Sequence, residues 1–202
     1  IAPSFSIAPS FSIAPSFSAP PSFSAPPSFS APPRFSCIDQ DTLIAYLDAF
    51  GGVGWKKASE IVIGDKVWSA TWDGLQSEKE FDPYTWYSSK LNNLETTVSE
   101  ISNILTHVKD VTMIINNKEN VRFSLEQTVL LKREGTYFFG STGQLEIGDI
   151  LVERQKDGTF EEIFITDITL IDEQRDVYEF DAAPNDILIA GNLIVHNKKL
   201  FA

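Results

Sequence analysis

The chain has 202 residues, 43% of them hydrophobic, a formal net charge of -12 at pH 7 and a single cysteine. The negative charge argues against nucleic acid or an anionic membrane surface as a partner, because both would repel the protein. The sequence has no run of about 18 apolar residues, the length needed to span a bilayer. With one cysteine and two distant histidines, we expect no disulfide, no metal site and no cofactor.

Residues 1–36 are six hexads, three of IAPSFS, two of APPSFS and one of APPRFS. Proline in every hexad removes backbone donors and fixes φ, while serine and alanine offer little surface to bury. The pattern therefore predicts a disordered, extended linker with polyproline II character. Weak contacts through the one phenylalanine of each hexad are the alternative.

The composition changes at Cys37, and the rest of the chain predicts one all-β domain. Short stretches rich in β-branched and aromatic residues alternate with Gly, Asn or Asp. These stretches are DTLIAYL, KVWSATW, VTMIINN, VRFSL, TYFF, IFITDITLI, DVYEF and DILIA. Residues 89–108 have apolar spacing that suits a short helix and a polar excursion equally well.

Two segments resemble each other, ASEIVIGDKVW at residues 58–68 and TGQLEIGDILV at residues 142–152. Each has apolar residues at alternating positions, then Gly-Asp, then a second apolar strand. This repetition predicts a β-fold with pseudo-twofold internal symmetry. The two Gly-Asp pairs are expected to be structural turns, in which glycine supplies a positive φ and aspartate bonds nearby backbone.

The C-terminal run NDILIAGNLIVHN predicts a hairpin with Gly191-Asn192 as a two-residue loop. That loop pairs Ala190 with Leu193, Leu188 with Val195, and Asp186 with Asn197. Cross-strand neighbours lie about 5 Å apart at Cβ, so the Asp186 carboxylate is expected to orient the Asn197 amide or to accept its proton. His196 would face the other side of its strand, unless the chain twists or the pairing ends there.

The two ends of this domain carry residues that can break peptide bonds. Asn197 can attack its own backbone carbonyl, closing a succinimide and expelling Lys198, while the adjacent His196 protonates the departing amine. Cys37 can attack the carbonyl of Ser36 and convert the amide into a thioester. The alternatives are a buried structural cysteine and an ordinary turn at His-Asn.

Together these features resemble the Hint superfamily of inteins, bacterial intein-like domains and hedgehog autoprocessing domains. CIDQDTLI is similar to the opening block, WKKASEIVIGDKVW to the strand pair that follows it, and DVYEFDAAPNDILIAGNLIVHN to the closing block. The resemblance covers residues 37–197 and leaves 198–202 as a short C-terminal flank. It implies a horseshoe-like all-β fold that brings both ends to one site, with Cys37 as the first nucleophile.

The sequence departs from the family pattern at several positions. The second block usually reads Thr-x-x-His, and here Ser124 stands at the threonine and Gln127 at the histidine, where it cannot shuttle protons near neutral pH. The closing block has Glu179 in place of aspartate, and Asp186 where histidine is common. These residues are still expected to assist the reactions.

Two cations and one histidine lie outside the matched positions. Lys132 or Arg122 could lower the pKa of the Cys37 thiol as a nearby cation, on their proximity in sequence to the second block. His107 lies outside the matched blocks and is expected to have a structural role.

Lys198 lacks the hydroxyl or thiol that receives the acyl group in splicing, so cleavage is favoured over ligation. The predicted activity is a single-turnover autocatalytic cleavage whose substrates are the protein's own flanking segments. Intein-like domains that end in His-Asn-Lys behind repetitive tails in bacteriophage structural proteins are similar. This similarity suggests other virion proteins as partners, in the virion or the host cytoplasm.

Two other classes of function fit the sequence. One is a catalytically degenerate Hint domain that serves as a structural or adhesive module of a virion, which the missing block histidine favours. The other is a multiple-turnover thiol hydrolase that uses Cys37 and a histidine.

Overall fold

A computed structural model describes residues 36–75 and 82–197. The predicted hexad linker, apart from Ser36, and the flank that begins with Lys198 lie outside the described residues. The described chain contains β-strands and two one-turn 3-10 helices but no α-helix, which confirms the predicted all-β class. None of its helices has the length and apolar character needed to cross a membrane.

The strands form one antiparallel sheet whose order is β12-β1-β7-β6-β4-β2-β13-β14-β10-β8-β9-β5, with β11 beside β10 and β3 beside β2. The strands are β1 (Ile38–Asp39), β2 (Leu43–Leu47), β3 (Val53–Lys57), β4 (Lys66–Thr71), β5 (Tyr87–Ser88), β6 (Glu95–Ile115), β7 (Arg122–Ser124), β8 (Thr128–Arg133), β9 (Thr136–Ser141), β10 (Ile150–Arg154), β11 (Phe160–Phe164), β12 (Ile168–Ala183), β13 (Ile187–Ala190) and β14 (Leu193–His196). The 3-10 helices are η1 (Ala58–Glu60) and η2 (Thr142–Gln144).

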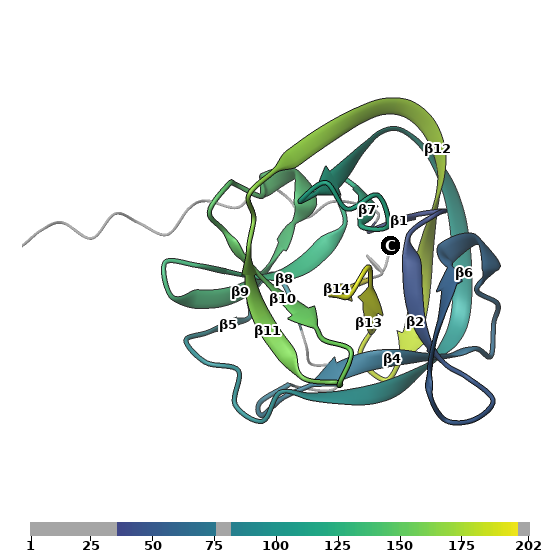
Figure 1. Cartoon of the computed structure of the whole chain (residues 1–202), viewed down its shortest axis with the longest axis horizontal. Coiled ribbons are helices and arrows are strands. Elements are labelled where there is room, and N and C mark those ends of the chain that lie inside the picture. The colour runs from purple at the N-terminus through teal and green to yellow at the C-terminus, as the bar shows by residue number, and fades with distance from the viewer. Residues whose placement is uncertain (1–35, 76–81, 198–202) are drawn as a thin grey trace, which may run out of the picture. The chain divides into compact units, whose positions relative to one another are not determined.

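The longest strands, β6 and β12, pair along most of their length and curve together through the domain (Figure 1). The sequence of residues 89–108 suits a short helix and a polar excursion equally well. In the structure most of this segment, residues 95–108, forms the first part of β6. Its threonines, valines and isoleucines favour strand. β4 pairs with its first residues and β12 with the rest, so the strand has partners throughout.

The predicted repeat is present as two turns with matching geometry. Gly64 and Gly148 have φ values of +91° and +98°, which an L side chain rarely adopts. The carboxylates of Asp65 and Asp149 each accept a hydrogen bond from the backbone N–H three residues earlier, at 3.0 and 2.9 Å. The expected structural role of both Gly-Asp pairs is confirmed.

Each turn is also fixed to a distant segment by the same pair of backbone bonds. The glycine N–H donates at 2.8 Å in both copies, to Ile101 O in the first and Ile165 O in the second. Each isoleucine N–H donates in return to the aspartate carbonyl, at 2.9 and 2.8 Å. The two halves therefore repeat one hydrogen-bonding unit.

The C-terminal hairpin, β13 and β14, is buried on both faces. Because strand side chains alternate between faces, Leu188 and Val195 pack into one hydrophobic cluster, whereas Ile187 and Ile194 pack into another. Figure 1 shows the hairpin between β2 and β10, in agreement with the strand order. Its final residue, His196, is thereby held inside the domain.

The register of this hairpin is the predicted one, with Ala190 opposite Leu193 and Leu188 opposite Val195. The loop glycine, Gly191, packs so closely that an added Cβ would lie 2.7 Å from Val121 Cγ2. Only glycine fits there without displacing its neighbour.

Candidate active site

The two junctions of the domain meet directly. The Ser36 hydroxyl donates to the His196 carbonyl at 3.1 Å, and the Thr128 N–H donates to Ser36 Oγ at 2.8 Å. His196 is also opposite Thr128 in the pairing of β14 with β8. The residues before Cys37 and before Asn197 are thus in contact although 160 positions separate them.

Cys37 is a free thiol with no exposed surface, and it precedes β1. Its carbonyl accepts a hydrogen bond of 3.0 Å from the N–H of Ser124, the last residue of β7. Within residues 36–75 and 82–197, the buried Ser124 hydroxyl has no hydrogen-bond partner. Ser124 therefore lies beside Cys37, the predicted nucleophile.

The pKa of the Cys37 thiol is raised to about 12, and burial is the largest cause. The negative charges of Glu179 and Glu126 also raise this pKa, while the positive charge of Lys109 lowers it. Lys109 and Glu126 also pair with each other at 3.1 Å. The resting thiol is consequently protonated near neutral pH.

Gln127 contacts the C-terminal junction. Its side-chain Nε2 donates to the His196 carbonyl at 3.2 Å and to the Thr128 carbonyl at 2.9 Å. The residue is completely buried. At this position the amide holds the junction in place by hydrogen bonds, but it supplies no group that titrates.

Glu179 and His107 lie beside Cys37. His107 Nε2 is 3.5 Å from Glu179 Oε2, and a ring nitrogen, a carboxylate oxygen and the Cys37 sulfur all lie within 4.8 Å of one another. His107 lies outside the matched sequence blocks, but the pairing of β6 with β12 brings it beside Cys37. Its expected structural role stays a prediction.

The same trio bears on metal binding. The prediction of no metal site depended on the histidines being distant from the cysteine, whereas the fold gathers one thiol, one imidazole and one carboxylate. A structural zinc site takes four protein ligands, and the group among the described residues provides three.

Neither Arg122 nor Lys132 is placed to lower the pKa of the Cys37 thiol, because each is paired elsewhere. Arg122 Nε donates to Thr112 Oγ1 at 2.7 Å and lies 3.4 Å from Asp39 Oδ2. Lys132 Nζ donates to Glu162 at 2.7 Å. The cation that lowers the pKa of the thiol is Lys109, which no motif in the sequence marks.

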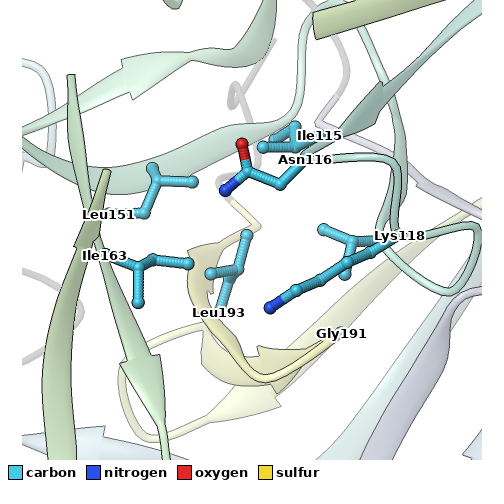
Figure 2. Close-up of a pocket in the computed structure, with 8 residues that line it drawn as sticks. Ile115, Asn116, Lys118, Leu151, Ile163, Gly191 and Leu193 are labelled. Atoms are coloured by element: carbon cyan, nitrogen blue, oxygen red, sulfur yellow. The ribbon is translucent and has the colours of Figure 1, made fainter. Parts of the chain in front are cut away.

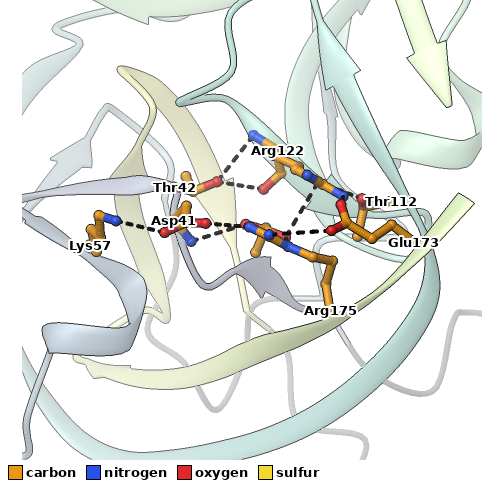
Figure 3. A network of polar contacts seen from close by, with 8 residues as sticks. Asp41, Thr42, Lys57, Thr112, Arg122, Glu173 and Arg175 are labelled. Carbon is orange, nitrogen blue, oxygen red and sulfur yellow. Dashed lines mark hydrogen bonds and ion pairs between the residues drawn. The ribbon is translucent and has the colours of Figure 1, made fainter. Parts of the chain in front are cut away.

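Arg122 belongs to a polar network around β1 (Figure 3). At its centre the buried Asp39 carboxylate accepts two hydrogen bonds from Arg175, each 3.1 Å long. Arg122 and Arg175 also contact Glu173, and Arg175 contacts Asp41. The network attaches the residue two positions after Cys37 to β7 and β12.

At the C-terminal junction, His196 packs the edge of its ring against Phe139, with centroids 5.5 Å apart. The N–H of Asn197 donates to the Asp186 carbonyl at 2.9 Å, so these two residues are adjacent as predicted. Asp186 Oδ1 accepts a hydrogen bond from Ala182 N at 2.9 Å, and among the described residues no hydrogen bond joins the Asp186 carboxylate to the Asn197 carboxamide.

The Asn197 side chain is 1% exposed, and in the described part of the chain neither atom of its carboxamide has a hydrogen-bond partner. Buried polar groups are nearly always bonded. An unbonded side-chain nitrogen in the residue that would act as a nucleophile is compatible with attack on its own carbonyl.

A separate pocket is lined by Ile115, Asn116, Lys118, Val121, Leu151, Ile163, Gly191 and Leu193 (Figure 2). Its one charged residue, Lys118, pairs with Glu153 at 2.8 Å. None of the lining residues belongs to the junction site.

Comparison with known proteins finds no matching family model and no matching curated protein. Solved structures do match. The bacterial intein-like domain from Clostridium thermocellum is 16% identical, with a TM-score of 0.56, and the match covers 81% of this chain and 99% of that one.

Two inteins give the same result. The DnaB intein from Synechocystis sp. PCC 6803 is 13% identical, with a TM-score of 0.57 and coverage of 80% of this chain and 98% of that one. The Mvu mini-intein of transcription factor IIB is 16% identical, with a TM-score of 0.55 and coverage of 79% of this chain and 99% of that one. At these identities the likeness shows the fold.

Proposed function

We propose that residues 37–197, which have the Hint fold seen in inteins and bacterial intein-like domains, form a self-processing domain that cleaves peptide bonds at its own ends. The observation that carries this proposal is the contact between the junctions, the 3.1 Å hydrogen bond from Ser36 to His196. The substrates are the protein's own flanking segments.

The C-terminal reaction is cyclisation of Asn197. Its side-chain nitrogen attacks its own carbonyl carbon and releases one proton to water, and the bond to Lys198 breaks as the departing nitrogen gains a proton. His196 supplies that proton, and its contact with Phe139 restricts the ring orientation. Asp186 supports the reaction by holding the Asn197 backbone.

The N-terminal reaction is an acyl shift from the Cys37 nitrogen to its sulfur, which gives a thioester at Ser36. Ser124 binds the Cys37 carbonyl through its N–H, Gln127 holds the opposite junction and Glu179 lies beside the thiol. Since Lys198 has no hydroxyl or thiol, the thioester is expected to be released by water or an added thiol instead of being ligated.

Intact mass spectrometry of the full chain tests both reactions. We expect the wild type and Cys37→Ala to lose residues 198–202 with time, while Asn197→Ala retains them. Dithiothreitol should release residues 1–36 from Asn197→Ala, whereas Cys37→Ala should retain them. An unchanged mass of folded wild-type protein would contradict the proposal.

A Hint domain without chemistry, acting as a structural or adhesive module of a virion, is the second candidate. The raised pKa of Cys37 and the glutamine at residue 127 favour it. A folded wild type that keeps its full mass after prolonged incubation would support this function. The absence of exposed surface on Cys37 argues against a hydrolase that acts on external substrates.

A further inference from the structure

His107 and Glu179 occupy diagonal positions on neighbouring strands. His107 lies opposite Val177 in the pairing of β6 with β12, and Glu179 is two residues further along β12. Side chains at opposed and diagonal positions of an antiparallel pair share one face and can meet when they are long. The separation of 3.5 Å between His107 Nε2 and Glu179 Oε2 agrees with this register.

This pair points to the thiol. The Cys37 sulfur lies within 4.8 Å of both a His107 ring nitrogen and a Glu179 oxygen. Hydrogen bonds that transfer protons are often long before the reacting geometry forms.

The charges around Cys37 oppose the loss of its thiol proton, so the reaction requires a base near the sulfur. The charges that act on the thiol come from Glu179 on β12, Lys109 on β6 and Glu126 before β8, and the two carboxylates oppose ionisation. Lys109 is neutralised in part by its ion pair with Glu126. Gln127 cannot accept a proton, so the thiol needs another base.

We propose that His107 is the acid–base residue of the N-terminal acyl shift, replacing the histidine that residue 127 lacks, with Glu179 orienting its ring. This inference depends on the proposed cleavage at Ser36–Cys37. It explains how a Hint domain with glutamine in the second block could still use its cysteine.

The step balances without any other reactant. His107 takes the thiol proton, and the sulfur attacks the Ser36 carbonyl carbon to give a tetrahedral oxyanion. The carbon–nitrogen bond then breaks while the imidazolium returns the proton to the Cys37 nitrogen. The products are a Ser36 thioester on the Cys37 sulfur and a free amine on Cys37.

The test measures two cleavage rates in His107→Ala and His107→Gln, with EDTA present and with dithiothreitol in excess so that thiol exchange is not rate-limiting. Release of residues 1–36 should fall about 100-fold or more, the usual contribution of acid–base catalysis. Release of residues 198–202 should keep its wild-type rate and so report correct folding. The matched control is Val108→Ala, an exposed neighbour on β6, which should change neither rate.

Two further readouts separate catalysis from a structural role. The His107 side chain is 26% exposed, so added imidazole can reach its place and should restore part of the His107→Ala rate. The dependence on pH should also differ. The His107→Ala rate should rise by about tenfold per pH unit, because only the ionised thiol attacks without a base, and the wild-type rate should rise less steeply.

Release of residues 1–36 at the wild-type rate in both variants would overturn the role of His107 and leave the proposed function standing. Loss of both cleavages would show that His107 supports the fold, and would also overturn its proposed role as an acid–base residue. If the wild type releases only residues 198–202, the proposed N-terminal reaction is wrong and the role of His107 is overturned with it.

Discussion

The Cys37 thiol links the chemistry of the site to the stability of the fold. Burial, reinforced by Glu179, raises its pKa from 9.0 to about 12 in the folded protein. The unfolded chain releases this proton as the pH rises through 9, while the folded chain keeps it until about pH 12. The contribution to stability is therefore complete below pH 9 and is lost between pH 9 and 12.

Raising the pH from 7.5 to 10.5 should lower the unfolding free energy of both proteins. The decrease should be about 2 kcal/mol larger for the wild type than for Cys37→Ala, since one pKa unit is worth about 1.36 kcal/mol. Urea unfolding of both proteins, each in an Asn197→Ala background that prevents cleavage, gives the comparison. Tyrosines and lysines titrate in both, so their effects cancel. Equal losses would show that the thiol ionises in the folded state as it does in the unfolded chain.

Among the elements, β1 is short and depends on side-chain contacts for its position. It pairs with β12 and β7 through only two residues. The Asp39 carboxylate on β1 is fully buried and is held by Arg175 and Arg122. Because Cys37 directly precedes β1, these ion pairs also determine where the nucleophile lies.

Arg175→Gln should lower the unfolding free energy by about 3 kcal/mol, since it leaves a buried carboxylate with one weaker partner. It should also slow the thiol-dependent release of residues 1–36. Urea unfolding and intact mass measure the two effects. Lys57→Gln is the control, because it breaks the exposed pair with Asp41 in the same network and should leave the unfolding midpoint unchanged.

Elements with local pairing could be predicted from the sequence, and those with distant partners could not. The register of β13 and β14 follows from the two-residue loop at Gly191-Asn192, and the repeated turns follow from their Gly-Asp pairs. The alternation around His107 is compatible with a strand, but nothing local indicates that Val177 is its partner. The place of His107 in the site therefore needed the long-range register of β6 and β12.

At the scale of the whole domain, the site exists only when both repeated halves are folded. The C-terminal junction lies at the end of a hairpin whose two faces belong to different hydrophobic clusters. The N-terminal junction reaches it through Ser36 and through the adjacent residues Gln127 and Thr128, which belong to a second, distant segment. No single half of the domain contains the complete arrangement.

Cleavage at Asn197 should therefore be an intramolecular event that requires the folded state. We expect a first-order rate constant that is the same from micromolar to submillimolar protein, and that falls with added urea in proportion to the folded fraction measured by circular dichroism. Intact mass gives the rate in each solution, and Asn197→Ala gives the uncleaved baseline. A rate constant that rises with protein concentration would indicate cleavage between molecules. A rate that persists in the unfolded chain would mean that asparagine reacts through local chemistry alone, without the junction contacts.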